Sequence, residues 1–203
     1  SGGGGRFDFG ILYYMPQIWT SDDTDAVERL KIQYGTSYVY PPAAMSAHVS
    51  ACPNHQIGRT TPLEIRGEVA QMCNFGYEFN IGSLSEEERE QIRKQVIKHR
   101  QLEPLIARGD YYRLKSPYES NLCVWQLVSE DQSRSYVCVA FQNAMPNPKG
   151  EYVRLKGLCK DKKYRIEPLH VVVSGDSLMN AGLPMRQPGW EDHKVYAFDL
   201  QEV

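Results

Sequence analysis

The sequence predicts an α/β segment followed by an all-β segment, and the change falls near residue 110. Before that point, strand-like and helix-like stretches alternate, an order that favours parallel strands joined by crossover helices. After it, short strand-like runs follow one another with turns and no helix between them, a pattern typical of an antiparallel sandwich. We therefore expect two domains, residues 1–109 and 110–203.

Apolar spacing and chain-breaking residues predict the elements of the first segment. Residues 18–20 form a short β-prone stretch. Apolar residues then recur at helical spacing: Ala26, Val27, Leu30 and Tyr34. Gly35 is expected to end that helix. Two further strands are expected at 37–40 and 68–75, with a polar loop at 48–61 between them.

The clearest expected element is a helix that begins at Ser85. Ser85 and Glu88 form a capping box, in which each side chain binds a backbone N–H of the first turn. An apolar stripe follows: Ile92, Val96 and Ile97. Pro104 interrupts the pattern, and Gly109 ends the segment.

Six strand-like runs make up the second segment: 111–114, 123–128, 136–141, 152–155, 164–166 and 195–200. The polar turn at 130–133 separates the second run from the third, and this spacing predicts a hairpin.

Composition excludes several classes of function. The formal net charge of −2 is too small to favour nucleic-acid binding, which needs a basic excess. No apolar run approaches the ~18 residues of a membrane span. The five cysteines are odd in number and lack CxxC spacing, which favours reduced thiols and a cytoplasmic protein. Because the chain opens with Ser1 and a glycine run, we expect it to be the C-terminal part of a longer protein.

Acidic residues cluster where a strand-like run meets the first helix, at Asp22, Asp23 and Asp25. Carboxylates in this position cap helices, and this explains at least Asp25 or Asp23. Another can point into a pocket at the carboxyl end of a parallel strand, where α/β folds bind ligands. Trp19, next to this run, is the aromatic residue best placed to stack on a sugar.

Two other patterns have ordinary alternatives. The glycines at 2–5 suit a flexible linker or a backbone that closely approaches a ligand. His48, Cys52 and His55 resemble a metal spacing, but no fourth ligand accompanies them, so we expect a polar loop and no metal.

Several longer motifs together carry a family resemblance: residues 1–8, 12–17, 19–25, 48–51, 53–56, 74–78 and 174–180. With these motifs the chain resembles the α-galactosidases of glycoside hydrolase family 36. The resemblance implies that residues 1–109 are the C-terminal portion of a catalytic (β/α)8 barrel and that residues 110–203 are a C-terminal β-sandwich domain. Phe9 and Cys73 depart from the family pattern.

The resemblance also implies a site and a reaction. Asp22 is implied to be the general acid/base, and Ser1, Gly2 and Gly3 are implied to lie against the bound galactose. The nucleophile and further sugar-binding residues lie upstream in the family, so the isolated chain is expected to be inactive. The substrates implied are melibiose- and raffinose-type galactosides, with no cofactor, and the intact parent is expected to be a cytoplasmic homotetramer.

Alternatives remain in two classes. The same scaffold also suits an α-N-acetylgalactosaminidase or a galactosyltransferase that makes raffinose-type sugars. In a different class, the chain would be a non-catalytic C-terminal module with a carbohydrate-binding or structural role.

Overall fold

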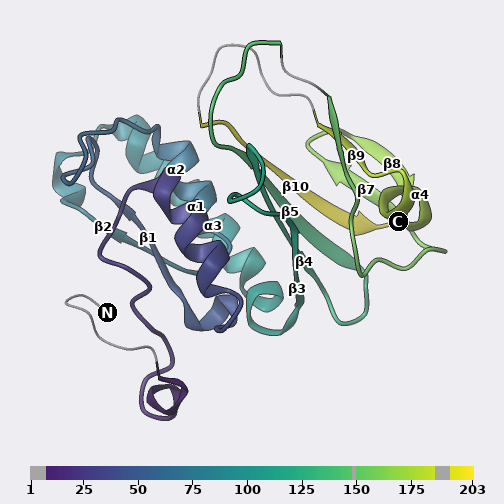
Figure 1. Cartoon of the computed structure of the whole chain (residues 1–203), viewed down its shortest axis with the longest axis horizontal. Helices are drawn as coiled ribbons and strands as arrows, with labels where there is room; N and C mark the ends of the chain where they lie inside the picture. Colours follow the sequence, from purple (N-terminus) through teal and green to yellow (C-terminus); the bar gives the residue numbers. More distant parts are fainter. Residues whose placement is uncertain (1–7, 148–149, 186–192) are drawn as a thin grey trace. The chain divides into compact units, whose positions relative to one another are not determined.

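The computed structural model describes residues 8–147, 150–185 and 193–203 (Figure 1). The chain divides into two compact units, Ser1–Ala107 and Arg108–Val203. Within the described ranges, no helix is both long enough and apolar enough to cross a membrane.

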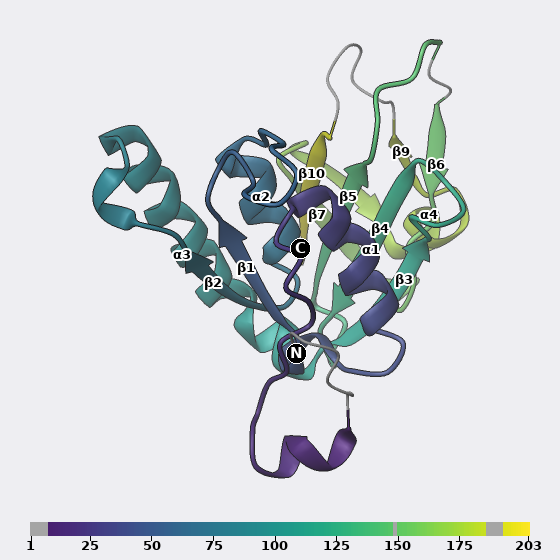
Figure 2. The ribbon, with the colours of Figure 1, turned by 60° about the vertical axis from the view of Figure 1, so that its left-hand side comes forward.

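The first unit contains short parallel strands and the helices around them: η2 (Phe9–Tyr13), α1 (Ala26–Thr36), η3 (Pro42–Ala44), β1 (Ser46–Ser50), α2 (Leu63–Ala70), β2 (Asn74–Glu78), η4 (Ile81–Ser83) and α3 (Glu86–Arg108). β1 and β2 pair in parallel, and Ile18 adds a single parallel bridge to Met45. Parallel neighbours need a crossover connection. α2 supplies it, and Figure 2 shows α2 beside β1.

Two strands expected in this unit are wrong. Residues 37–40 form a turn in which the Val39 amide donates to the Thr36 carbonyl. The 68–75 run contains the end of α2, a turn at 71–73 and only the first two residues of β2. The strand β1 lies largely where a polar loop was expected. All five of its residues are buried, including two serines and His48, so hydropathy does not mark it.

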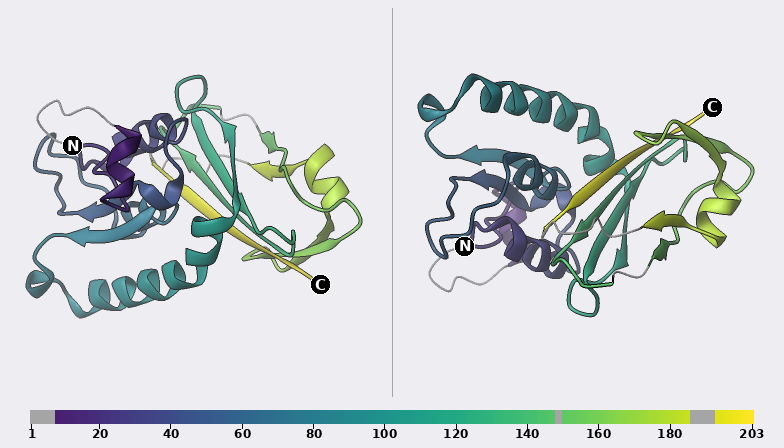
Figure 3. Two further views of the ribbon diagram at one scale, coloured as in Figure 1. Left: turned by 90° about the horizontal axis from the view of Figure 1, so that it is seen from below. Right: turned by 90° about the horizontal axis from the view of Figure 1, so that it is seen from above.

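The two predicted helices are present with shifted ends. α1 continues through Gly35 to Thr36. At the start of α3 the capping box is confirmed, because the Ser85 amide donates to Glu88 Oε2 at 2.9 Å and the Glu88 amide donates to Ser85 Oγ at 3.2 Å. α3 continues through Pro104 to Arg108, so the expected interruption does not end it. Figure 3 shows α3 running alongside the β1–β2 pair.

The second unit is mostly antiparallel: β3 (Asp110–Lys115), β4 (Leu122–Val128), β5 (Arg134–Phe141), β6 (Glu151–Val153), β7 (Lys163–Glu167), β8 (Val171–Ser174), α4 (Gly175–Asn180), β9 (Leu183–Met185) and β10 (Val195–Glu202). Six strands form one sheet in the order β3-β4-β5-β10-β7-β8, and β6 pairs with β9. The β4–β5 hairpin is confirmed. The expectation that no helix interrupts this segment is wrong, because α4 follows β8 directly, with Ser174 as its N-cap.

The core of the second unit lies between the large sheet and the elements that cover one of its faces. Apolar residues of β4, β5, β7 and β10 form one buried cluster with residues of β6, α4 and β9, including Val153, Leu178 and Leu183. Figure 3 shows these smaller elements on the same side of the sheet. Side chains at alternate positions of β4 and β5, such as Val124 and Val139, enter this cluster, and the residues between them are buried as well.

Candidate active site

A cavity of about 290 Å³ opens in the first unit beside the last residues of both parallel strands. The residues that line it come from four segments: Trp19, Asp22, Thr24, Ser50, Ala51, His55 and Glu78. Ser50 ends β1 and Glu78 ends β2. The cavity thus lies at the carboxyl ends of parallel strands, which is where α/β folds place their ligand sites.

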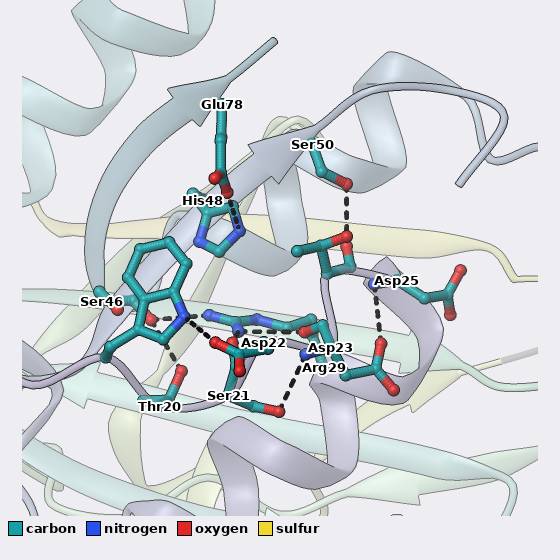
Figure 4. Close-up of polar contacts among 12 residues, drawn as sticks. Thr20, Ser21, Asp22, Asp23, Asp25, Arg29, Ser46, His48, Ser50 and Glu78 are labelled. Atoms are coloured by element: carbon teal, nitrogen blue, oxygen red, sulfur yellow. Dashed lines mark hydrogen bonds and ion pairs between the residues drawn. The ribbon is translucent and has the colours of Figure 1, made fainter. Parts of the chain in front are cut away.

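Asp22 presents its carboxyl group to this cavity. The side chain is exposed, and its Oδ1 accepts a hydrogen bond of 2.9 Å from the indole Nε1 of Trp19 (Figure 4). Trp19 and Asp22 thus lie side by side at the cavity, and the stacking of Trp19 on a sugar stays a prediction.

The neighbouring aspartates bind the backbone instead. Asp25 is the N-cap of α1, and its Oδ2 accepts hydrogen bonds of 3.0 Å from the amides of Val27 and Glu28. Asp25 also forms an ion pair with Arg59. Asp23 Oδ1 accepts a 3.0 Å hydrogen bond from the Asp25 amide. Asp25 and Asp23 therefore organise the start of the helix, which leaves the exposed carboxyl group of the run for other chemistry.

Trp19 stacks on His48, with ring centroids 4.5 Å apart and planes inclined by 14°. The stacking covers one face of the indole, and the residue remains 36% exposed. Trp19 thus connects the carboxyl group in the cavity to a buried ring on β1.

His48 is electrically neutral near pH 7. Burial, and after it the positive charge of Arg29, lower the pKa of His48, while Glu78 opposes them. The Nε2 atom lies 2.9 Å from Glu78 Oε2, but neither ring nitrogen makes an aligned hydrogen bond to any described residue. The ring therefore supports Trp19 chiefly by packing.

The loop that carries Asp22 is tied to β1 at both ends. Thr20 Oγ1 donates to the Ser46 carbonyl at 3.0 Å, and Ser50 Oγ donates to the Thr24 carbonyl at 3.0 Å. These buried bonds place the loop along the full length of the strand, with the acidic residue at its middle.

The other predicted site residues fall elsewhere. Ser1, Gly2 and Gly3 lie outside the described residues. His48 lies on β1 and Cys52 is exposed, and the described part of the chain contains no group of three side chains able to hold a metal ion. Sequence reasoning missed Ser50 and Glu78 as cavity residues, because only their positions at strand ends would have indicated them.

A parallel α/β unit with a cavity and an exposed carboxyl group at its strand ends is the arrangement in which α/β enzymes place their active sites. The profile of the melibiase family matches residues 1–109, and that of the glycosyl hydrolase family 36 C-terminal domain matches residues 122–198. The chain therefore belongs to glycoside hydrolase family 36.

Particular relatives are similar along the whole chain. The bifunctional α-galactosidase/sucrose kinase AgaSK of Mediterraneibacter gnavus is 48% identical over all 203 residues, which cover 22% of that protein. The α-galactosidase AgaA of Geobacillus stearothermophilus is 53% identical over 91% of this chain and 25% of its own length. Its crystal structure matches with a TM-score of 0.94 and 50% identity, over 100% of this chain and 28% of that one. The chain thus spans about a quarter of the length of these relatives.

Proposed function

We propose that this chain supplies the general acid/base, Asp22, to a retaining α-galactosidase that removes terminal α-D-galactosyl residues from galacto-oligosaccharides of the melibiose and raffinose type. The observation that carries this proposal is the division of roles in the acidic run. Asp23 and Asp25 bind backbone amides, whereas Asp22 is exposed to the cavity and held by an indole N–H. In support, AgaA variants have been solved in complex with stachyose and with raffinose.

In the proposed reaction Asp22 acts twice. A retaining glycosidase uses two carboxyl groups about 5–5.5 Å apart. Asp22 protonates the departing glycosidic oxygen while a nucleophilic carboxylate attacks the anomeric carbon, and it then takes a proton from the water that hydrolyses the galactosyl-enzyme. Because Trp19 donates to Oδ1, Oδ2 is the oxygen that carries this proton. The nucleophile is proposed to lie outside these 203 residues, which span about a quarter of the relatives' length, and the isolated chain is then expected to be inactive.

The architecture proposed for the intact enzyme places this site in a barrel. The 18–20 stretch, β1 and β2 are neighbours in chain order, through the Ile18–Met45 bridge and the β1–β2 ladder, as successive strands of a (β/α)8 barrel are. The shared core of the large sheet and the β6–β9 pair supports a β-sandwich for the second unit. The glycines near the start of the chain are proposed to lie against the galactose, and the parent is proposed to be a cytoplasmic homotetramer that needs no cofactor.

The test compares leaving groups on the full-length protein that contains this chain. General acid catalysis contributes roughly 10²–10⁴-fold, so Asp22→Ala should lower raffinose turnover by about that factor. Turnover of an aryl α-galactoside should fall by a smaller factor, because its good leaving group needs less protonation. Glu64→Ala is the matched control, since Glu64 is an exposed carboxylate on α2 that does not line the cavity. Equal losses on both substrates would contradict the acid role.

The same assay separates the alternatives. Turnover of an α-N-acetylgalactosaminide in preference to the galactoside would identify the other hydrolase, and galactosyl transfer to a sugar acceptor in preference to water would identify the transferase. Absence of all turnover, with galactoside binding by residues 111–203 in isothermal titration, would identify a binding module.

A further inference from the structure

We propose that Arg29 is the positioning residue of Asp22, because its guanidinium group binds the backbone on both sides of that aspartate and so holds the carboxyl group at a fixed angle to the cavity. This inference rests on the proposed acid role of Asp22. It assigns to Arg29, which lies on the buried side of the loop, the task of orienting that carboxyl group.

The contacts of Arg29 bracket a single residue. Nη1 donates to the Ser21 carbonyl at 3.2 Å and to the Asp23 carbonyl at 3.3 Å (Figure 4). These carbonyls belong to the residues immediately before and after Asp22. With both in place, the two backbone dihedrals of Asp22 are restricted, and the direction of its side chain is restricted with them.

The same guanidinium group connects the loop to the sheet. Nη2 donates to the Ser46 carbonyl at 2.7 Å, at the first residue of β1. That carbonyl also accepts the hydroxyl of Thr20. Arg29 therefore fixes the middle of the acidic loop to the strand, between the points where Thr20 and Ser50 tie its ends.

The position of Arg29 is costly for a residue with only a packing role. The residue is 2% exposed, and burial lowers the pKa of its guanidinium group, with Cys73, Asp23 and Glu78 opposing that effect. Its Nε is buried without a hydrogen-bond partner among the described residues. Burial of a single charged group is costly unless hydrogen bonds or an ion pair compensate it. The hydrogen bonds to three carbonyl groups explain why a charged residue is buried here. A planar guanidinium group can reach all three at once, whereas the compact ammonium group of a lysine cannot.

The test is Arg29→Lys in the full-length protein, with raffinose and an activated aryl α-galactoside as substrates. A misplacement of about 1 Å can cost on the order of 10²-fold, and protonation matters mainly for the poor leaving group. We expect kcat for raffinose to fall about 100-fold and kcat for the aryl substrate to fall less than about threefold, with KM nearly unchanged.

Gln33→Leu is the matched control. Gln33 is buried on the same helix, and its Nε2 donates to the Val69 carbonyl at 2.9 Å and not to the loop of Asp22. Loss of a buried contact to a carbonyl group by itself lowers the fraction of folded enzyme and hence both activities equally. The ratio of the two kcat values should therefore stay at the wild-type value in Gln33→Leu and change in Arg29→Lys.

A second variant and a double mutant keep the inference testable if Arg29→Lys does not fold. Arg29→Met replaces the buried charge with an apolar chain of similar length and should show the same selective loss. In an Asp22→Ala background, either change should leave the ratio unaltered, because no carboxyl group remains to be positioned. Equal losses on both substrates, or a further change of the ratio in the double mutant, would overturn the inference. Failure of Asp22→Ala to discriminate between the substrates would instead overturn the proposed function.

Discussion

Asp25 should be the structural member of the acidic run, and Asp25→Ala measures how much it stabilises the fold. The change removes the acceptor of two 3.0 Å backbone hydrogen bonds at the start of α1 and the partner of Arg59. Loss of an N-cap costs about 1 kcal/mol, within a range of roughly 0.5–2. Loss of a largely buried, charged hydrogen-bond acceptor adds about 1.5–3 kcal/mol. We therefore expect α1 to be destabilised by about 2–4 kcal/mol.

Amide hydrogen exchange measured by mass spectrometry is the suitable assay, because it reports the local opening of one helix within a protein of more than one unit. At about 1.4 kcal/mol for each factor of ten, exchange across residues 26–36 should accelerate roughly 30-fold to several-hundred-fold. Asp22→Ala is the control. Its exposed side chain holds no amide of α1, so exchange should change by less than about threefold. Equal acceleration in both variants would refute the assignment of the capping role to Asp25 and not to Asp22.

Two further predictions concern pH and packing. Burial lowers the pKa of His48, so the unfolded chain binds the proton more readily and the folded protein should lose stability as pH falls below about 6.5. His48→Phe keeps a ring against Trp19 and should lessen the drop in melting temperature between about pH 7.5 and pH 5. An undiminished drop would contradict this. A Cβ at position 175 would lie 2.1 Å from the Cys159 carbonyl oxygen, whereas one at position 76 meets nothing within 4 Å. Gly175→Ala should therefore destabilise the second unit by about 2 kcal/mol or more in thermal unfolding, whereas Gly76→Ala should change stability little. Similar losses of stability in the two variants would contradict the packing described for Gly175.

The strands of the second unit were predictable because their signal is local. Runs such as 123–128 and 136–141 are rich in β-branched and aromatic residues, and turn residues separate them. The β8 strand was missed although it is apolar, because it is only four residues long and leads directly into the short helix α4.

The strand β1 and the helix α2 were not predictable in the same way. The polar residues of β1 are buried against partners that are distant in sequence, as when Ser50 donates to the Thr24 carbonyl. Within α2, Gly67 weakens the helix pattern. A Cβ there would lie 2.2 Å from the Gln95 side chain of α3. The glycine is therefore required by close packing against α3, which local helix propensity does not reveal.

The candidate site likewise has a part that the sequence predicts and a part that depends on tertiary contacts. Trp19 and Asp22 are close together in the sequence, so their proximity was predictable. Which of the three aspartates faces the cavity was not, because that depends on which of them bind backbone amides at the start of the helix. Arg29 gave no signal at all, because its role follows from carbonyl groups that come together only after folding.

The most direct test of the central claim is a crystal structure of the full-length Asp22→Asn protein with raffinose bound. The amide at position 22 should lie within about 2.6–3.2 Å of the glycosidic oxygen, with its other atom still paired to the Trp19 indole. A side chain turned away from the sugar and bound to the backbone amides of α1 would contradict the account.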